Sequence, residues 1–170
     1  MATFMEDNCF YYISPAGCLR IKNNGDAISE ISFMDEHVSM ASKQHMKRIP
    51  PVLRECIDQL DKYFAGELFS FNCKLAPEGT AFQQLVWEKL QQVPYGRTAS
   101  YLALSKQVGN IKSIRAVGTA NGKNPVAIII PCHRIIGSNG SLVGYAGGLS
   151  RKQWLLNHEA KHANGVQTLF

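Results

Sequence analysis

The chain contains an apolar run, Val126–Ile130, that leads directly into Pro131-Cys132-His133-Arg134-Ile135. Five consecutive apolar residues, most of them β-branched, need burial, and they predict a fully buried β-strand. Because proline cannot donate a hydrogen bond to a neighbouring strand, Pro131 predicts the end of that strand. A thiol, an imidazole and a guanidinium are therefore expected where a buried sheet reaches the surface.

Cys132 is a candidate nucleophile for this reason. A reactive cysteine needs an exposed position beside positive charge or a base, and His133 and Arg134 are of those two kinds. The alternative is a buried structural cysteine, because a free cysteine is often simply a small hydrophobic residue. The rest of the chain has to decide between these two interpretations.

Composition limits the class of protein. A chain of 170 residues, 45% of them hydrophobic, suits one ordinary domain or two small ones. Met1–Asn8 is polar and acidic, and no apolar run approaches the ~18 residues of a membrane span, so we expect no signal peptide and no membrane partner. Five cysteines without a CxxC pair indicate a reducing compartment rather than a disulfide framework. We expect a soluble intracellular protein.

The charge is distributed unevenly along the chain. Residues 1–80 carry a net charge of −3, whereas residues 81–170 carry 10 lysines and arginines but only Glu88 and Glu159 as acids, a net charge of +8. Such a segment has few carboxylates to pair with its cations, which predicts a positive face for a polyanion such as nucleic acid. A solvated basic surface without a partner is the alternative.

The first half of the sequence is typical of a small antiparallel meander followed by a helix. Strands are predicted over Cys9–Ser14, Cys18–Lys22 and Ala27–Phe33, because these short β-rich runs are separated by turn residues. A helix is predicted from Pro50–Pro51 to about Phe64. We interpret this half as a scaffold.

The first half also contains residue types that bind metals, but none of them has the spacing of a zinc site, so we expect no metal. These residues are Cys9, Cys18, His37, His45, Cys56 and Cys73.

The second half is predicted to be mostly helical. Residues 74–80 form an expected linker, and Thr80 is the expected N-cap of a helix that runs to about Gln92. Two further short helices, Ser100–Val108 and Ser113–Gly122, are separated by a tight glycine-containing turn, which is typical of a helix-turn-helix unit. The helix that begins at Thr80 is expected to carry Phe82, Leu85, Val86 and Leu90 on its buried side.

The helix over Ser113–Gly122 has mostly small side chains, and Arg115 is its only long cation. Small side chains let the backbone approach a surface closely, as the narrow minor groove of DNA requires, and one projecting arginine can then enter the duplex. Such a helix would bind the phosphates and the groove shape of DNA and would discriminate little between base sequences. A close contact between helices is the alternative explanation for the small residues.

Cys132 and His133 are adjacent, so in an extended chain they would point to opposite faces and would interact only through a turn or a bridging water. A carboxylate is needed to orient the imidazole. Outside the acidic first half only Glu88 and Glu159 qualify, and Glu159 follows a predicted short helix, Leu149–His158, and can fold back toward the site. The sequence has neither a GxGxxG motif after a strand nor a P-loop, so we expect no cofactor. A nucleophilic cysteine of this kind can keep the group that it takes.

Seven motifs of this sequence occur together in one family: Tyr63-Phe64-Ala65-Gly66, Tyr95-Gly96-Arg97-Thr98, Ser100-Tyr101, Asn124-Pro125-Val126, Pro131-Cys132-His133-Arg134, Gly144–Gly148 and Trp154–Glu159. With them the chain resembles the O6-alkylguanine-DNA alkyltransferases, the methylated-DNA–protein-cysteine methyltransferase family. The resemblance extends from about residue 60 to 159. Residues 1–58 match in pattern more than in letters.

The resemblance implies an α/β protein of two domains. An N-terminal ribonuclease-H-like α/β domain is expected over residues 1–76. A C-terminal, mostly helical, winged-helix-like DNA-binding domain with a helix-turn-helix, which also carries the alkyl acceptor, is expected over residues 80–160. Residues 161–170 would form a tail.

The implied activity is the irreversible transfer of the alkyl group of O6-alkylguanine to Cys132, with O4-alkylthymine as a further candidate substrate. The protein would dock in the minor groove of double-stranded DNA, flip the damaged base out and react once per molecule. The resemblance implies no cofactor. The expected form is a monomer in the cytoplasm, associated with the nucleoid, or in the nucleus if the source is eukaryotic.

The resemblance also implies roles for individual residues. Cys132 would accept the alkyl group, His133 would act as a base through a water molecule, and Glu159 would orient the imidazole. Asn124 would connect the hydrogen bonds of the site, and Tyr101 would turn the phosphate of the lesion and assist the leaving guanine. Arg115 would fill the vacated stack. The other implied DNA-binding residues are Ser113, Ala116, Thr119, Lys123 and Arg134, and the implied base pocket is formed by Leu142, Val143, Tyr145, Ala146 and Gly147.

Ala146 departs from some relatives, in which a hydroxyl residue occurs, so one hydrogen bond to the base is not expected here. Two other functions compete with alkyl transfer. An alkyltransferase-like protein that only binds lesions would lack the cysteine, whereas Cys132 is present. An unrelated cysteine–histidine hydrolase would not account for Asn124, Arg115 and the basic half together.

Overall fold

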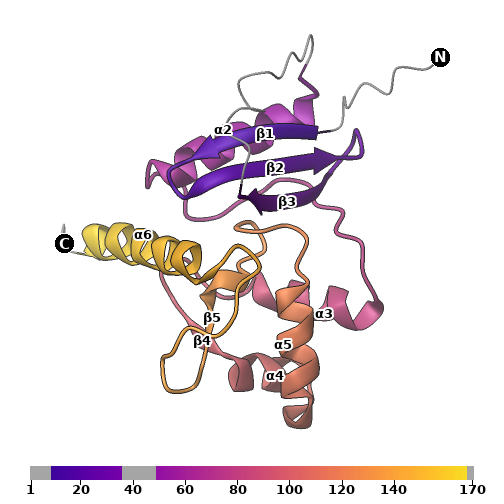
Figure 1. Cartoon of the computed structure of the whole chain (residues 1–170), viewed down its shortest axis with the longest axis vertical. Coiled ribbons are helices and arrows are strands. Elements are labelled where there is room, and N and C mark those ends of the chain that lie inside the picture. Colours follow the sequence, from indigo (N-terminus) through magenta and orange to yellow (C-terminus); the bar gives the residue numbers. More distant parts are fainter. Residues whose placement is uncertain (1–8, 36–48, 168–170) are drawn as a thin grey trace.

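The computed structural model describes residues 9–35 and 49–167 of the chain. A strand-rich layer covered by a helix lies at one end of the molecule, and a cluster of helices lies at the other (Figure 1). The last helix runs beside the junction between them. This arrangement agrees with the predicted division into a strand-rich first half and a helical second half.

The N-terminal part forms an antiparallel sheet in the order β1-β2-β3. β1 spans Cys9–Ser14, β2 spans Gly17–Asn23 and β3 spans Ile28–Met34. The first hairpin is tight because Gly17 has a φ of 131°, which favours glycine, and the Ser14 hydroxyl donates to the Gly17 carbonyl oxygen over 2.6 Å. The predicted meander is confirmed.

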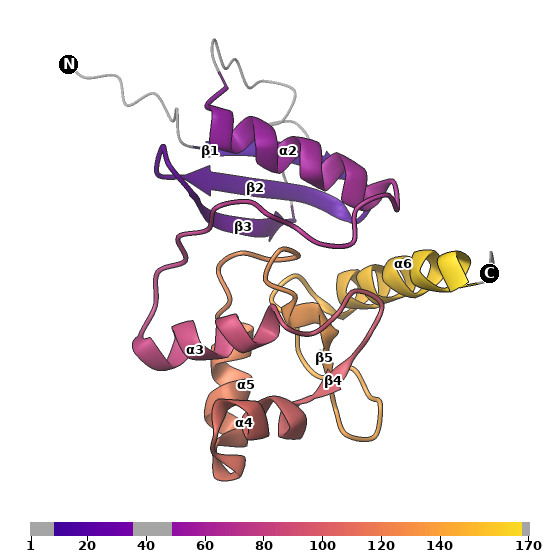
Figure 2. The same cartoon turned by 180° about the vertical axis from the view of Figure 1, so that it is seen from behind.

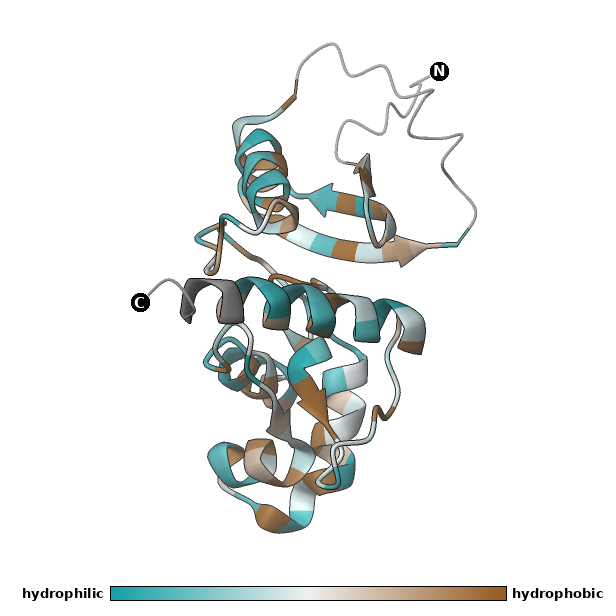
Figure 3. Ribbon diagram, turned by 90° about the vertical axis from the view of Figure 1, so that its left-hand side faces the viewer, coloured by the Kyte–Doolittle hydropathy of each residue, from teal (hydrophilic) through white to brown (hydrophobic). Residues whose placement is uncertain are grey.

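Helix α2 spans Pro51–Phe64, with proline at its start, as predicted. It lies across one face of the sheet (Figure 2), and the strands and helix carry alternating hydrophobic and hydrophilic positions (Figure 3). Leu53, Leu60 and Tyr63 of α2 are fully buried together with Leu19 of β2. The two elements therefore share one core.

The candidate metal ligands of this half that the structure describes do not form a group of three. Within residues 9–35 and 49–167, no three His, Cys, Asp or Glu side chains are arranged so that they could hold a metal ion. His37 and His45 lie outside the described residues.

Helix α3 spans Ala81–Leu90 and begins with a capping box between Thr80 and Gln83, which confirms the predicted N-cap. Val86 and Leu90 are buried as predicted, and Leu85 is half-buried. The prediction for Phe82 is wrong, since it is 36% exposed. The helix instead turns the larger Trp87 inward, where its indole nitrogen donates to the Ala120 carbonyl oxygen over 2.9 Å.

Helix α4 (Tyr101–Val108) and helix α5 (Ile114–Gly122) confirm the predicted pair of short helices. Gly109 ends α4 with a φ of 100°. A short 3-10 helix, η1 (Ile111–Ser113), then leads into α5, and the Asn110 side chain caps it by accepting from the backbone of Lys112. Helices α3, α4 and α5 pack against one another (Figure 2).

The predicted strand over Val126–Ile130 is wrong, although its burial is as expected. The segment is folded into turns, and Ile128 has a φ of 72°, which is rare for a β-branched residue. Asn124 makes this compact form possible because its side chain donates to the Ile130 carbonyl oxygen over 2.7 Å and accepts from the Val126 amide over 3.0 Å. Only Val126 forms a bridge with a strand, pairing with Ile31 of β3.

The segment continues into a 3-10 helix, η2 (Cys132–Arg134), and a short strand, β5 (Ile135–Ile136). β5 pairs in parallel with β4 (Ala99–Ser100), which precedes α4. Cys132 is thus held between a buried turn and a two-residue strand.

Helix α6 spans Leu149–Gln167, longer than the predicted helix Leu149–His158. Glu159 therefore lies inside the helix and does not follow it. Residues 161–167, predicted as part of a tail, continue the helix, because no glycine or proline interrupts it before Gly165. None of the described helices combines the length and the apolar character that a membrane span requires.

Candidate active site around Cys132

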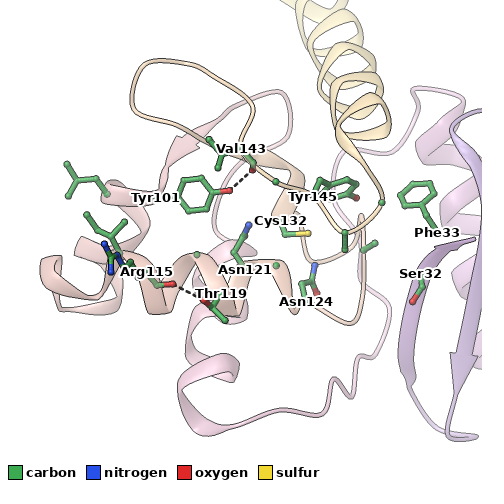
Figure 4. A pocket seen from close by; sticks show the side chains of 18 of the residues that line it. Ser32, Phe33, Tyr101, Arg115, Thr119, Asn121, Asn124, Cys132, Val143 and Tyr145 are labelled. Atoms are coloured by element: carbon green, nitrogen blue, oxygen red, sulfur yellow. Dashed lines mark hydrogen bonds between the residues drawn. The ribbon is translucent and has the colours of Figure 1, made fainter.

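Cys132 lies in the wall of a cavity of about 900 Å³. The cavity lies between α4, α5, the loop before α6 and the edge of β3 (Figure 4). Cys132 is only 6% exposed, so the expectation of a surface thiol is wrong. Its side chain faces the cavity between Asn124 and Tyr145 (Figure 4).

The surroundings of the thiol have opposing effects on its acidity. Burial raises the pKa of Cys132, and a hydrogen bond with Asn124 and the positive charge of Lys152 offset part of that rise. The group is therefore mainly a thiol near neutral pH, and a base is needed to make it a nucleophile.

His133 is the nearest base in the sequence and is completely buried. Its Nε2 lies 2.7 Å from Oε1 of Glu159. Burial lowers the pKa of His133, and Glu159 offsets only part of this decrease, so the imidazole is neutral. A neutral ring that donates from Nε2 has a free lone pair on Nδ1, and no partner for this atom exists within the described part of the chain.

Glu159 accepts hydrogen bonds from several sides. Besides His133, its donors are the Tyr63 hydroxyl at 2.8 Å, Nε of Arg134 at 2.9 Å and the backbone amide of Gly96 at 3.3 Å. Burial alone would raise the pKa of Glu159, but His133 and Arg134 outweigh burial and leave that pKa lowered. The carboxylate is therefore ionised and fixes the orientation of the imidazole, as expected from the sequence.

Arg134 was predicted to bind DNA, and this prediction is wrong. The residue is 6% exposed, and its guanidinium donates to both carboxylate oxygens of Glu159 and, over 2.6 Å, to the carbonyl oxygen of Val93. A buried charge needs a partner of opposite sign, and Glu159 is the carboxylate within reach. Arg134 therefore holds the Glu159 carboxylate in place and is too buried to bind a phosphate.

Lys152 belongs to the site but was missed by the sequence analysis. This lysine of α6 is fully buried, and its Nζ donates to the carbonyl oxygens of Ile135 at 2.6 Å, Val143 at 3.2 Å and Gly144 at 3.2 Å. Burial lowers the pKa of Lys152, whereas Cys132 acts in the opposite direction. Its position on the same helical stripe as Leu155 and Glu159 was a signal for burial.

Tyr101 lies at the start of α4 and lines the cavity, as its predicted role requires. Its hydroxyl donates to the carbonyl oxygen of Val143 over 2.9 Å. Burial raises the pKa of Tyr101, and Cys132 adds to the rise. The phenol is thus a hydrogen-bond donor at neutral pH.

The predicted DNA-binding residues of α5 are close to the cavity mouth. Arg115 and Thr119 line it, and Thr119 donates to the Arg115 carbonyl oxygen over 3.0 Å. Ala116 is exposed beside them, Ser113 is half-buried at the start of the helix, and Lys123 is exposed after its end.

Four predicted base-pocket residues, Val143, Tyr145, Ala146 and Gly147, line the cavity, whereas Leu142 does not. Further lining residues that were not predicted include Asn121 of α5 and two residues of β3, Ser32 and Phe33. The Phe33 and Tyr145 rings pack edge to face, with 6.3 Å between their centroids. A Cβ on Gly147 would lie 2.7 Å from the Phe33 ring, so a glycine is needed for this close approach.

Two family models match the chain. The model of the 6-O-methylguanine DNA methyltransferase DNA-binding domain matches residues 81–161, and the model of the ribonuclease-like domain of the same methyltransferase matches residues 9–77.

Similar whole proteins exist in other organisms. A methylated-DNA–protein-cysteine methyltransferase of Methanosarcina acetivorans is 46% identical over 146 residues, which are 86% of this chain and 94% of that protein. One of Mycobacterium bovis is 43% identical over 157 residues, 92% of this chain and 94% of that protein.

Solved structures are similar over the same length. The Mycobacterium tuberculosis O6-methylguanine methyltransferase aligns with a TM-score of 0.79 at 41% identity, covering 91% of this chain and 93% of that chain. The M. tuberculosis protein OGT in complex with DNA aligns with a TM-score of 0.80 at 42% identity and the same coverage.

Proposed function

The chain belongs to the O6-methylguanine DNA methyltransferase family, and we propose that it repairs O6-alkylguanine in duplex DNA by moving the alkyl group to Sγ of Cys132. The observation that carries this assignment is the position of Cys132 in the cavity wall, next to the buried His133–Glu159 pair. A thiol that opens into a cavity large enough for a base and is backed by a proton acceptor suits a nucleophilic acceptor.

The reaction begins with removal of the thiol proton. A bridging water passes this proton to Nδ1 of His133, whose Nε2 stays hydrogen-bonded to Glu159. The thiolate attacks the alkyl carbon, so that an S–C bond forms and the C–O6 bond breaks. The bonding pair leaves with the base. The base takes up, by way of water, the proton that His133 received from the thiol, and becomes guanine. The Tyr101 hydroxyl assists this departure by donating to the base instead of to Val143.

The product is a thioether, which no group of the proposed site is suited to hydrolyse. Each molecule therefore reacts once.

We also propose that α4, the following turn and α5 act as a helix-turn-helix within a winged-helix-like domain over residues 80–160. The small exposed residues of α5, including Ala116, allow the helix to approach the minor groove closely. Arg115, at the cavity mouth, enters the stack as the damaged base turns into the cavity. Residues 1–76 form the ribonuclease-H-like domain. One chain contributes every residue of the site, so the protein acts as a monomer, in the cytoplasm on the nucleoid or in the nucleus of a eukaryote.

The test is incubation with duplex DNA that carries O6-methylguanine with a radiolabelled methyl group. We expect label on the peptide that contains Cys132, at no more than one per chain, and none after Cys132→Ala. Because DNA affinity comes from cations and α5, the variant should bind the duplex within a few-fold of the wild type. Binding without label in the wild type would instead support a lesion-binding protein, and label on another cysteine would overturn the assignment of Cys132.

A further inference from the structure

Two cysteines of the N-terminal half lie against each other in the fold. Cys56 belongs to α2 and is fully buried, and Cys73 is half-buried in the segment that follows this helix. Their thiols are hydrogen-bonded to each other, and both side chains pack in the same hydrophobic core. The proposed alkyl transfer uses neither thiol, so it does not account for this contact.

The backbone on both sides of Cys73 fixes its place beside α2. Gln59 lies one turn after Cys56 and accepts from the backbone amide of Asn72 over 3.0 Å. The side-chain amides of Gln59 and Asn72 are hydrogen-bonded as well. On the other side of Cys73, residues 74–76 make two backbone hydrogen bonds of 2.8 Å to β3. The two thiols are therefore brought together by the fold on either side of them.

Cys73 is the member of the pair that small molecules can reach. It lines a cavity of about 300 Å³ whose walls also include Phe71, Tyr95 and Pro131. A water molecule takes up about 30 Å³ in the liquid, so a cavity of this size has room for a small oxidant such as a peroxide. Cys56 is 0% exposed and lies behind Cys73 in the core. One thiol is thus accessible and the other is enclosed within its reach.

The contact also makes the two thiols chemically unequal. The hydrogen bond between them lowers the pKa of Cys73 and raises the pKa of Cys56. A thiolate is the form that reacts with peroxides, so Cys73 is the nucleophile of the pair. Cys132 differs from Cys73 in both respects, because it is 6% exposed and burial raises its pKa.

We propose that Cys56 and Cys73 form a redox modification site, at which a peroxide oxidises Cys73 and Cys56 converts the product to a reversible disulfide. The Cys73 thiolate attacks one peroxide oxygen, the O–O bond breaks, and Cys73 becomes a sulfenic acid while hydroxide leaves and takes up a proton. The Cys56 sulfur then attacks Sγ of Cys73, so that an S–S bond forms and the S–OH bond breaks. The hydroxyl group leaves with the Cys56 proton as water. Two thiols are oxidised, and the peroxide is reduced to water.

The disulfide limits oxidative damage to the protein. A sulfenic acid that no thiol resolves is oxidised further to a sulfinic acid, which is irreversible, whereas cellular thiols reduce a disulfide by exchange. The bond is therefore transient in a reducing compartment. Cys132, the proposed alkyl acceptor, stays reduced while the pair is oxidised, so the protein keeps its capacity to react with damaged DNA.

The test treats the reduced full-length protein with a slight excess of hydrogen peroxide, and a parallel sample also contains dimedone, which traps sulfenic acids. Trypsin separates the two cysteines, because Cys56 lies in the peptide 55–62 and Cys73 lies in the peptide 63–74. Without dimedone, we expect mass spectrometry to find these two peptides joined by a disulfide. Dithiothreitol should separate them again.

The variants remove each thiol in turn. Cys56→Ala leaves Cys73 without its resolving partner, so dimedone should accumulate on Cys73. Cys73→Ser should leave Cys56 unmodified, because that thiol is buried. Cys9→Ser is the matched control, since it removes another half-buried cysteine of the same half, and the linked peptides should form as in the wild type. Transfer of label from DNA to Cys132 should persist after the disulfide has formed.

A wild type that gives no linked peptides would overturn the inference, whether or not dimedone is found on Cys73. Loss of label transfer to Cys132 before the linked peptides form would also overturn it. Neither result bears on the proposed function, which is tested with protein that has not met peroxide. A chain that forms the disulfide but never accepts label from DNA would overturn the proposed function alone.

Discussion

At the scale of single residues, Arg115 is expected to act when the damaged base leaves the stack. Arg115 is exposed at the mouth, where it can replace the base that leaves the stack. Arg115→Ala should slow transfer from duplex DNA about tenfold or more, because base flipping then loses its stabilising insert. Free O6-alkylguanine should react at close to the wild-type rate. Single-turnover rates on both substrates check this, and equal losses would place Arg115 in the fold or the pocket.

Lys152 is the residue with the clearest consequence for pH. It is buried near Cys132, and its positive charge lowers the pKa of that thiol, which burial has raised. Lys152→Met removes the charge, so the pKa of Cys132 should rise further and the thiolate fraction at a given pH should fall. The rate of Cys132 alkylation by iodoacetamide, followed by mass spectrometry, should reach its half-maximum at higher pH than in the wild type. Lys161→Met, an exposed change on the same helix, should leave the profile in place.

The sequence placed a residue in the site where a motif contains a reactive side chain. It did not predict the position of a charged residue that is buried. Cys132 and His133 follow from their order after Pro131, and Glu159 follows from the scarcity of acids in the second half. Arg134 was misassigned because an arginine in a basic segment is usually solvated, whereas here it pairs with the buried acid. Lys152 was missed for the same reason.

At the scale of elements, α6 connects to η2 through one carboxylate. Glu159 is 1% exposed and binds both His133 and Arg134. Glu159→Gln should therefore lower the free energy of unfolding by about 3–5 kcal/mol, because Arg134 would remain buried without a counter-charge. Urea unfolding at neutral pH measures the loss. A change below 1 kcal/mol would mean that the carboxylate contributes little to docking of the helix.

Both members of the His133–Glu159 pair make the wild type less stable in acid. The pKa of His133 is lowered in the folded state, so the unfolded chain takes up the proton first as the pH falls below about 6.5. The pKa of Glu159 is also lowered, so its contribution is present above about pH 4.3 and is lost as the pH falls further. Urea midpoints between pH 8 and 3 should decline in both windows, and Glu159→Gln should flatten the lower one.

Elements with a regular hydrophobic period were predictable, and the one without a period was not. The strands β1–β3, α2, and the pair α4 and α5 have a clear pattern and clear turn residues. The Val126–Ile130 run predicts burial, but a continuous apolar run does not distinguish a strand from a buried turn. The turn forms because Asn124 supplies the hydrogen bonds that a neighbouring strand would otherwise provide.

At the scale of the whole molecule, residues 81–170 carry a net charge of +8, but not all of their cations are available to bind DNA phosphates. Three of its ten cations are used internally: Arg134 by Glu159, Lys152 by backbone carbonyls, and Arg151 by Asp35 and the Ala16 carbonyl oxygen. The exposed cations on or beside α4 and α5 are Lys106, Lys112, Arg115 and Lys123.

This distribution predicts the dependence of DNA affinity on salt. Arg115 is proposed to enter the base stack, so Lys106, Lys112 and Lys123 remain for phosphate contacts. Three such contacts correspond to a slope of about −3 in a plot of log affinity against log salt concentration, whereas all ten cations would give about −9. Lys106→Ala should reduce the slope by about 1, and Lys161→Ala on α6 should not change it. Binding isotherms at several salt concentrations measure both. A wild-type slope near −9 would mean that DNA contacts far more of the molecule than the helices near the cavity.

The edge of β3 is completed by two segments that are distant in the sequence. Ile28 exchanges backbone hydrogen bonds with Lys74 and Ala76, and Ile31 exchanges them with Pro125 and Ala127. During synthesis, which proceeds from the N-terminus, the sheet can form long before residue 127 leaves the ribosome. Over that interval half of the β3 edge is open, and an open edge invites pairing with other chains. The turn that holds the nucleophile thus also closes the edge at which a nascent chain is most prone to aggregate.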